Sequence, residues 1–236
     1  MAQTWGLLTN HALVLIYVTK HRASTVRAIS EGVGVTERAT LSILRELDVS
    51  GIVARHRDGR RNTYSVDFER LAAYRREGTV ALTPREFVDG LIGTLLSVSD
   101  DARDDNGALR ALPDSGAQEP RIGTWGFFTN HALLLLSIGM DQSATVREMA
   151  MSVGITERAV VAISQQLEED GIIVRRRIGR RNEYQIDLDA LRSFPRWSPG
   201  EWKIPDELID VAVRGLQLLV VRSGGSELSS AQASSA

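Results

Sequence analysis

The chain has 236 residues, 43% of them hydrophobic and 25% charged, a composition typical of a soluble protein with one large or two small globular domains. It has no cysteine, which excludes disulfides, thiolate nucleophiles and cysteine-ligated metals and predicts a cytoplasmic location. The longest apolar run, residues 12–18, is far shorter than the roughly 20 residues of a membrane span, so no membrane partner is expected.

The basic charge is concentrated in two short segments, although the net charge is −2 and the pI is about 6.1. All of the 28 Lys and Arg residues except Lys20 and Lys203 are Arg, and they cluster in residues 55–61 and 175–181. Nucleic acid therefore remains a candidate partner, because a total charge averages over surfaces of opposite sign.

The sequence contains an internal duplication. Residues 4–71 align with residues 124–191 at an offset of 120 without a gap, and about 31 of these 68 pairs are identical. Residues 84–89 then align with 205–210 after a slip of one residue. The predicted organisation is listed in chain order: copy 1 over residues 1–99 with a trailing helix over 83–98, a flexible acidic linker over 100–122, copy 2 over 123–222 with a trailing helix over 205–221, and a disordered tail over 223–236.

Within copy 1, threonines mark the starts of three predicted helices. The first helix runs from Thr9 to about Lys20, the second opens at Thr25 and stops near Gly34, and the third is capped by Thr36 and ends at Gly51. The same signals recur in copy 2, where Thr145 and Glu148 also form a capping-box pattern.

Two β-capable runs follow the third helix in each copy and predict a hairpin. They cover residues 52–55 and 64–66 in copy 1, and 172–175 and 184–186 in copy 2, on either side of a glycine-containing turn. Ala39, Ile43 and Leu47 recur every four residues in the third helix and predict its buried stripe, with 159, 163 and 167 as their equivalents.

This order of elements predicts a mainly α fold with small β-hairpins, of the α+β class: two tandem winged helix-turn-helix domains. Each trailing helix carries an apolar stripe that needs a partner, and the other trailing helix is the natural one. We therefore expect an intramolecular pseudo-dimer with paired trailing helices. The alternative is that each trailing helix packs only on its own domain.

Three motifs, each present twice, resemble a known group of regulators. They are Thr-Asn-His-Ala in the first helix, Thr-Glu-Arg-Ala at the start of the third, and Gly-Arg-Arg-Asn in the hairpin turn. In this order they resemble the small bacterial winged helix-turn-helix transcriptional regulators of the MarR and ArsR families, over about 80% of the chain. The resemblance implies a dimeric repressor or activator that binds double-stranded DNA, here with the dimer fused into one chain, as a monomeric pseudo-dimer or a further homodimer.

The residues themselves also favour DNA. Guanidinium groups at the hairpins can contact phosphates or a narrow minor groove; the hairpin candidates are Arg55, Arg57, Arg60, Arg61, Asn62, Arg175, Arg177, Arg180, Arg181 and Asn182. Asn62 is expected mainly to stabilise the turn. The third helix is the expected reader of the major groove; its candidates are Thr36, Glu37, Arg38, Ser42, Arg45, Thr156, Glu157, Arg158 and Gln165.

The reading surfaces of the two copies have diverged, at positions 40 and 160, 42 and 162, and 45 and 165. Leu41, Val161 and Ala162 are apolar where similar regulators often have polar residues, which weakens the expectation of strong base specificity. If both copies read DNA, the site is an imperfect inverted repeat with half-site centres about 10 base pairs, or a multiple, apart.

Other functions were weighed against DNA binding. With four histidines and no cysteine, the chain has few side chains that act as nucleophiles or metal ligands. We therefore expect that the protein is not an enzyme and binds no metal and no cofactor. An effector-binding pocket between the copies is an alternative; its candidates are Trp5, Asn10, His11, Trp125, Asn130 and His131, and plain packing of these aromatic residues is the simpler interpretation. A winged-helix scaffold for a protein partner, with weak DNA binding, is a third.

Overall fold

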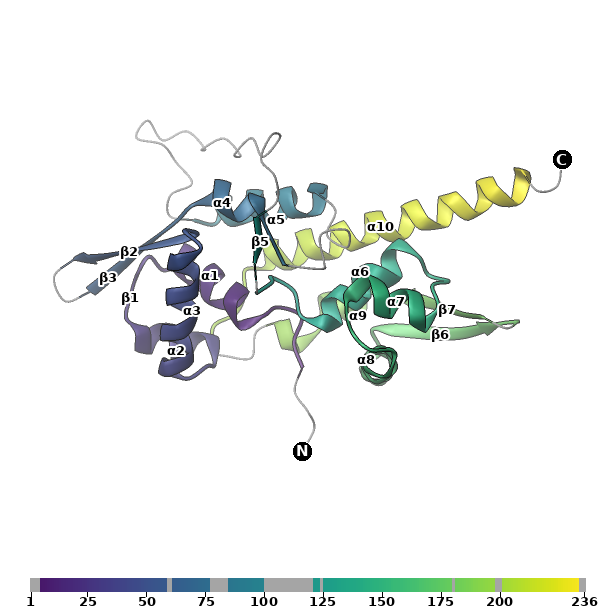
Figure 1. Ribbon diagram of the computed structural model, residues 1–236, viewed down its shortest axis with the longest axis horizontal. Helices are drawn as coiled ribbons and strands as arrows, with labels where there is room; N and C mark the ends of the chain where they lie inside the picture. Colours follow the sequence, from purple (N-terminus) through teal and green to yellow (C-terminus); the bar gives the residue numbers. More distant parts are fainter. Residues whose placement is uncertain are drawn as a thin grey trace.

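Figure 1 shows the computed structural model, which describes residues 5–58, 61–76, 85–99, 121–123, 125–179, 181–197 and 201–233. The elements of the first half are α1 (Asn10–Lys20), β1 (Ala23–Ser24), α2 (Val26–Val33), α3 (Glu37–Val49), β2 (Val53–Asp58), β3 (Arg61–Val66), α4 (Phe68–Ala73), β4 (Tyr74–Arg76) and α5 (Arg85–Ser97). Those of the second half are β5 (Arg121–Gly123), α6 (Asn130–Met140), α7 (Val146–Val153), α8 (Glu157–Glu169), β6 (Ile173–Ile178), β7 (Arg181–Ile186), α9 (Leu188–Arg192), a 3₁₀ turn (Pro195–Trp197) and α10 (Asp206–Ala233).

The predicted helix caps are confirmed. Thr25 and Thr36 each accept a hydrogen bond from the backbone N–H three residues on, and Thr145 forms the reciprocal capping box with Glu148. Gly34 ends α2 with a φ of 80°, in the left-handed region where a side chain would be strained. Because the same local signals are present twice, the two halves form the same helices at equivalent positions.

The described part of the protein is a mixed α+β structure, largely helical with small sheets, which confirms the α+β class of the prediction. In the first half β1 adds to the hairpin in the order β1-β3-β2; in the second half β6 pairs with β7. Strands β4 and β5 pair in parallel, so residues 121 and 122 belong to a strand and not to the predicted linker. The rest of that linker, residues 100–120, lies outside the described residues.

Two short helices after the hairpins were not predicted. Asp67 caps α4 by accepting from the backbone N–H of Arg70, and Asp187 caps α9 by accepting from that of Ala190. The repeated aspartate immediately after the last hairpin strand is the sequence signal that marks them.

The halves meet through reciprocal hydrogen bonds. The Thr9 hydroxyl donates to the Gly126 carbonyl at 2.6 Å and the Thr9 N–H to the Phe127 carbonyl at 3.0 Å. Thr129 repeats both bonds toward Gly6 and Leu7 at the same lengths. Equivalent residues that exchange the same bonds define a pseudo-twofold axis between the halves.

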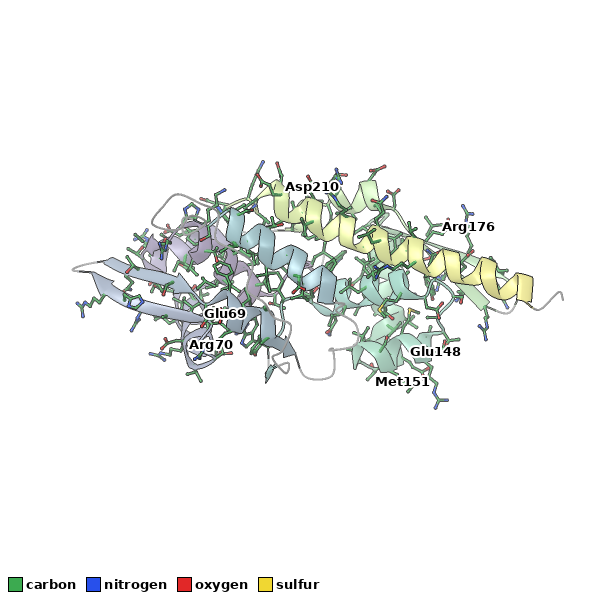
Figure 2. The ribbon with its side chains drawn as sticks, turned by 90° about the horizontal axis from the view of Figure 1, so that it is seen from above. Glu69, Arg70, Glu148, Met151, Arg176 and Asp210 are labelled. Carbon is green, nitrogen blue, oxygen red and sulfur yellow. The ribbon has the colours of Figure 1, made fainter. Side chains whose placement is uncertain are left out.

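The predicted contact between the trailing helices is confirmed: α5 and α10 pack against each other, and α10 also packs against α6. A β-carbon on Gly215 of α10 would lie within 2.5 Å of the Phe87 ring on α5, so glycine permits this close approach. Figure 2, seen from above, shows α5 and α10 side by side in front of the rest of the molecule. Helix α10 continues to Ala233, which corrects the prediction of a disordered tail for residues 223–233.

Both halves share one hydrophobic core, which runs from α1 and α6 to α5 and α10. Helix α1 is buried on nearly all sides, since six of its apolar residues from Ala12 to Val18 are at most 1% exposed. A segment of the second half also contacts the first. The backbone N–H of Trp202 donates to the Gly32 carbonyl at 3.1 Å, and the Trp202 ring contacts the Tyr17 ring edge-on. Within the described part of the chain, no helix has the length and apolarity needed to cross a membrane.

Candidate nucleic-acid interface

The outward face of α3 and α8 carries the helix residues predicted to read DNA. Arg38, Ser42 and Arg45 are exposed on α3, and Arg158, Ala162 and Gln165 are exposed on α8. Glu37 and Glu157 are exposed in the first turn of each helix, where a carboxylate complements the helix dipole. Thr36 and Thr156 are the N-caps, and each accepts from the backbone N–H of the alanine three residues on at 3.2 Å.

The buried stripe of these helices differs from the predicted one. Thr40 and Val160 are fully buried, whereas Ala39 and Ala159 are only half-buried. The stripe includes positions 40, 43, 44 and 47 in α3, so burial of Ile43 and Leu47 is confirmed, whereas Thr40 is buried in place of Ala39 and Leu44 is added. The reason is that α3 packs on α1 and α2 together, and a helix in a groove between two helices buries a wider stripe. Positions 40 and 160 consequently do not belong to the outward face.

The hairpins extend from opposite ends of the molecule, β2 and β3 at one end and β6 and β7 at the other (Figure 1). The side chains of Arg55, Arg57, Arg175 and Arg177 are exposed on these strands. Arg181 is exposed at the start of β7, and Figure 2 shows Arg176 pointing away from the body. Arg60 and Arg180 lie outside the described residues, as does the side chain of Arg61.

Asn62 and Asn182 are strand residues, which corrects the expected turn role of Asn62. Asn62 pairs with Arg57 across the hairpin and Asn182 pairs with Arg177. The second turn begins with Gly179 at a φ of 62°, the conformation that a two-residue hairpin loop requires. The loop is therefore shorter than the motif alone indicates.

Each hairpin is anchored by a buried tyrosine, and the second has an additional anchor. Tyr64 and Tyr184 are each 1% exposed and pair across the strands with Arg55 and Arg175. Burial raises the pKa of the Tyr64 phenol above its ordinary value. In the second half the Arg175 guanidinium also forms an ion pair with Glu168 of α8 at 3.2 Å. Among the described ion pairs, the equivalent Asp48 and Arg55 form none with each other.

A chain of contacts leads from the seam between the halves to the outward face of α3. Trp125 of the second half stacks on His11 with ring centroids 5.1 Å apart, and the His11 Nε2 atom lies 3.0 Å from the Glu46 carboxylate. The Ser42 hydroxyl donates to the other oxygen of the Glu46 carboxylate at 3.2 Å. One ring contact and two polar contacts thus join the seam to the outward face of α3.

The equivalent chain in the second half has different chemistry. Trp5 stacks on His131 at 4.3 Å, and the His131 Nε2 atom lies 2.8 Å from the Gln166 amide oxygen. This series of contacts ends at Gln166 because Ala162, the equivalent of Ser42, has no hydroxyl. Burial lowers the pKa of His131 below its ordinary value, and the Gln166 hydrogen bond acts in the opposite direction.

The residues predicted to line an effector pocket at the seam instead pack against one another. The Trp5 and His131 rings are parallel within 4° and in contact, which leaves no space between them. His11 and His131 do not meet across the axis, since each stacks on a tryptophan of the other half. Asn10 and Asn130 are the first residues of α1 and α6. These positions support plain packing at the seam.

Sequence reasoning missed a cavity of about 100 Å³ between α3 and the first hairpin. Apolar side chains of Leu41, Leu44 and Val53 form part of its wall, and Arg45 and Arg55 are the cationic groups at it. No sequence signal marks it, because its walls come from a helix and a hairpin that meet only in the folded chain.

Comparison of the chain with protein-family models, with curated proteins and with solved structures finds no match in any of the three. The functional argument therefore rests on the residues and their geometry.

Proposed function

We propose that this protein is a DNA-binding transcriptional regulator built from two tandem winged helix-turn-helix units. The observation that carries the proposal is that one unit, an outward helix with an arginine-rich hairpin, occurs at both ends of a single pseudo-twofold molecule. The described hairpin arginines are exposed in both units, Arg55 and Arg57 in the first and residues 175–177 and 181 in the second, although the chain as a whole has a net charge of −2.

The arrangement of the two units fits one duplex lying along the molecule. In Figure 1, α3 lies beside the first hairpin, α8 lies below α10, and the two hairpins point to opposite ends of the molecule. The twofold symmetry of B-DNA matches a protein whose halves are related by a twofold axis. Here the axis is defined by the reciprocal Thr9 and Thr129 bonds. The helices supply major-groove contacts and the hairpins supply contacts to phosphates or the minor groove.

The test measures binding of duplexes from a random pool by fluorescence anisotropy over a range of salt concentrations. The variant Arg57→Ala/Arg177→Ala removes one exposed arginine from each hairpin. We expect weaker binding to every duplex and a reduction of about 2 in the slope of log K against log salt, because each phosphate contact contributes about 0.9.

The matched control is Arg214→Ala/Arg222→Ala, which removes two exposed arginines from α10, an element that belongs to neither hairpin. We expect it to retain the wild-type slope. Equal loss of affinity in both variants, or no salt-dependent binding by the wild-type chain, would contradict the proposal and favour a scaffold for a protein partner.

Effector-responsive DNA binding is a second candidate, favoured by the cavity between α3 and the first hairpin. A ligand seated there would touch Leu41 and Arg45 beside the outward face of α3, so it would alter the surface offered to DNA. The seam residues predicted for this role are packed together, so the cavity is the better location. A thermal-shift screen of small carboxylates against wild type and Leu44→Trp, which fills the cavity, tests it: a shift lost in the variant supports an effector site.

A further inference from the structure

We infer that the DNA site of this chain is asymmetric. One half-site has G·C pairs at the positions read by Ser42 and Arg45 of α3, and the other has A·T pairs at the matching positions under α8. The inference rests on the proposed function and deepens it. A homodimer presents two identical faces, whereas a fused chain can present two different ones, and the exposed residues of α3 and α8 differ in the chemistry that distinguishes bases.

The outward face of α3 favours guanine and cytosine. Arg45 is exposed, and a guanidinium forms its best paired hydrogen bonds with O6 and N7 of guanine. The Ser42 hydroxyl proton is directed to the Glu46 carboxylate, so the Ser42 oxygen is left to accept. The amino group of cytosine is a donor in the major groove that such an acceptor can bind. His11, which stacks on Trp125, contacts the other oxygen of the Glu46 carboxylate, so the seam supports this orientation of Ser42.

The outward face of α8 favours adenine and thymine at the matching positions. Gln165 replaces Arg45, and an amide side chain pairs best with N6 and N7 of adenine. Val161 is 40% exposed and Ala162 is exposed, and their methyl groups suit the thymine C5-methyl. Arg38 and Arg158 are the same residue type at equivalent positions and both are exposed, so the two half-sites share the position that these arginines read.

The second hairpin is suited to A·T-rich flanking DNA. It carries three consecutive exposed arginines, Arg175, Arg176 and Arg177, where the first hairpin has His56 between two arginines. Narrow minor grooves in A·T tracts have enhanced negative potential and attract inserted arginines. The Arg175–Glu168 ion pair fixes this hairpin against α8, so its remaining arginines are presented from a defined position.

A site with two different half-sites fixes the orientation of the protein on the duplex. With identical half-sites the two orientations would be equal in energy, whereas exchanging the two half-sites would here place Arg45 over adenine and Gln165 over guanine. Each wrong base pair typically weakens binding about 5- to 150-fold, so one orientation dominates.

The test is selection of bound duplexes by the wild-type chain and by two exchange variants. We expect a non-palindromic site for wild type, with G·C pairs in one half and A·T pairs in the other. The variant Val161→Leu/Ala162→Ser/Gln165→Arg/Gln166→Glu gives α8 the outward residues of α3 together with the carboxylate that orients the serine, and we expect it to select G·C pairs in both halves. The reciprocal variant Leu41→Val/Ser42→Ala/Arg45→Gln/Glu46→Gln should select A·T pairs in both halves.

The outcomes separate the inference from the function on which it rests. A palindromic site selected by the wild type, or half-sites unchanged by the exchanges, would overturn the inference while leaving DNA binding intact. Failure of the wild-type chain to enrich any duplex would overturn the proposed function instead. All substituted side chains are exposed or half-buried, and unchanged circular dichroism melting confirms that the variants are folded.

Discussion

The two ends of the seam are built from equivalent residues but are bonded differently. Trp5 stacks between His131 and Phe194, and its indole N–H donates to Asp170 at the end of α8 at 2.9 Å. Trp125 has the same stacked arrangement with His11 and Tyr74, yet its buried indole nitrogen has no partner within the described part of the chain. Ser50 replaces Asp170 in this half, and its hydroxyl donates to the Leu47 carbonyl instead.

This difference indicates that the two copies kept the same ring stacking at the seam while their hydrogen bonds there diverged. Ring stacking depends on shape and area, which the repeated tryptophans and histidines maintain in both halves. A hydrogen bond to a carboxylate depends on one side chain, so a single change from Asp to Ser removes it. The second half is therefore held at its α8 end by a bond that the first half lacks at α3.

The largest expected effect comes from removing either tryptophan. Trp5→Ala should lower the free energy of unfolding by about 3–5 kcal/mol, because it removes two ring contacts and the bond to Asp170. Trp125→Ala should cost about 1–3 kcal/mol less, since it removes similar ring contacts but also a buried donor without a partner. Urea denaturation monitored by circular dichroism measures both values.

Phenylalanine substitutions sharpen the same comparison. Trp5→Phe and Trp125→Phe lose the same ring atoms, so the difference between them isolates the indole N–H. A larger loss for Trp5→Phe is expected, and equal losses would show that the Trp5–Asp170 bond contributes nothing to stability.

An intermediate effect is expected from restoring the missing bond. Ser50→Asp places a carboxylate opposite the Trp125 indole and should stabilise the protein by about 1 kcal/mol, after the unfavourable interaction of an acid with the α3 C-terminus is included. The same substitution in a Trp125→Phe background should give no gain. A gain that persists without the indole would show that it arises elsewhere.

The smallest effect concerns pH and follows from His131. Burial lowers its pKa in the folded state, so the unfolded chain takes up the proton first as pH falls. The contribution of neutral His131 is complete above the unfolded pKa of about 6.5 and is lost as pH falls through the lower folded value. Urea titrations between pH 7.5 and 5 should show stability falling with acid, and His131→Phe should flatten that fall. An unchanged slope in the variant would assign the pH dependence to other groups.

Local signals in the sequence were sufficient for most secondary structure. Caps such as Thr25, Thr36 and the Thr145–Glu148 pair act within one helical turn, so neighbouring residues determine them. The predicted buried stripe of the third helix is correct at Ile43 and Leu47 and wrong at Ala39. Burial of Thr40 and not Ala39 depends on where α1 and α2 lie against α3, which spacing within α3 alone does not specify.

The candidate site divides in the same way. Exposure of Arg38, Arg45 and Gln165 followed from the period of the helix. The series of contacts from Trp125 through His11 to Glu46 and Ser42 did not follow from the helix period. Trp125 and His11 belong to different halves and lie far apart in the sequence. Asn62 was misplaced because hairpin register depends on cross-strand pairing as well as on the turn motif.

The sequence by itself determined that this protein is a duplicated helix–hairpin unit with two arginine-rich hairpins. Those features depend on repeats and on interactions between near neighbours. Only the tertiary structure decided how the duplicates meet, which tryptophan found a hydrogen-bond partner, and that Trp202 would dock on the first half. Those contacts join residues far apart in the chain, and their formation depends on packing the two halves around one core, where shape and satisfied polar groups select the arrangement.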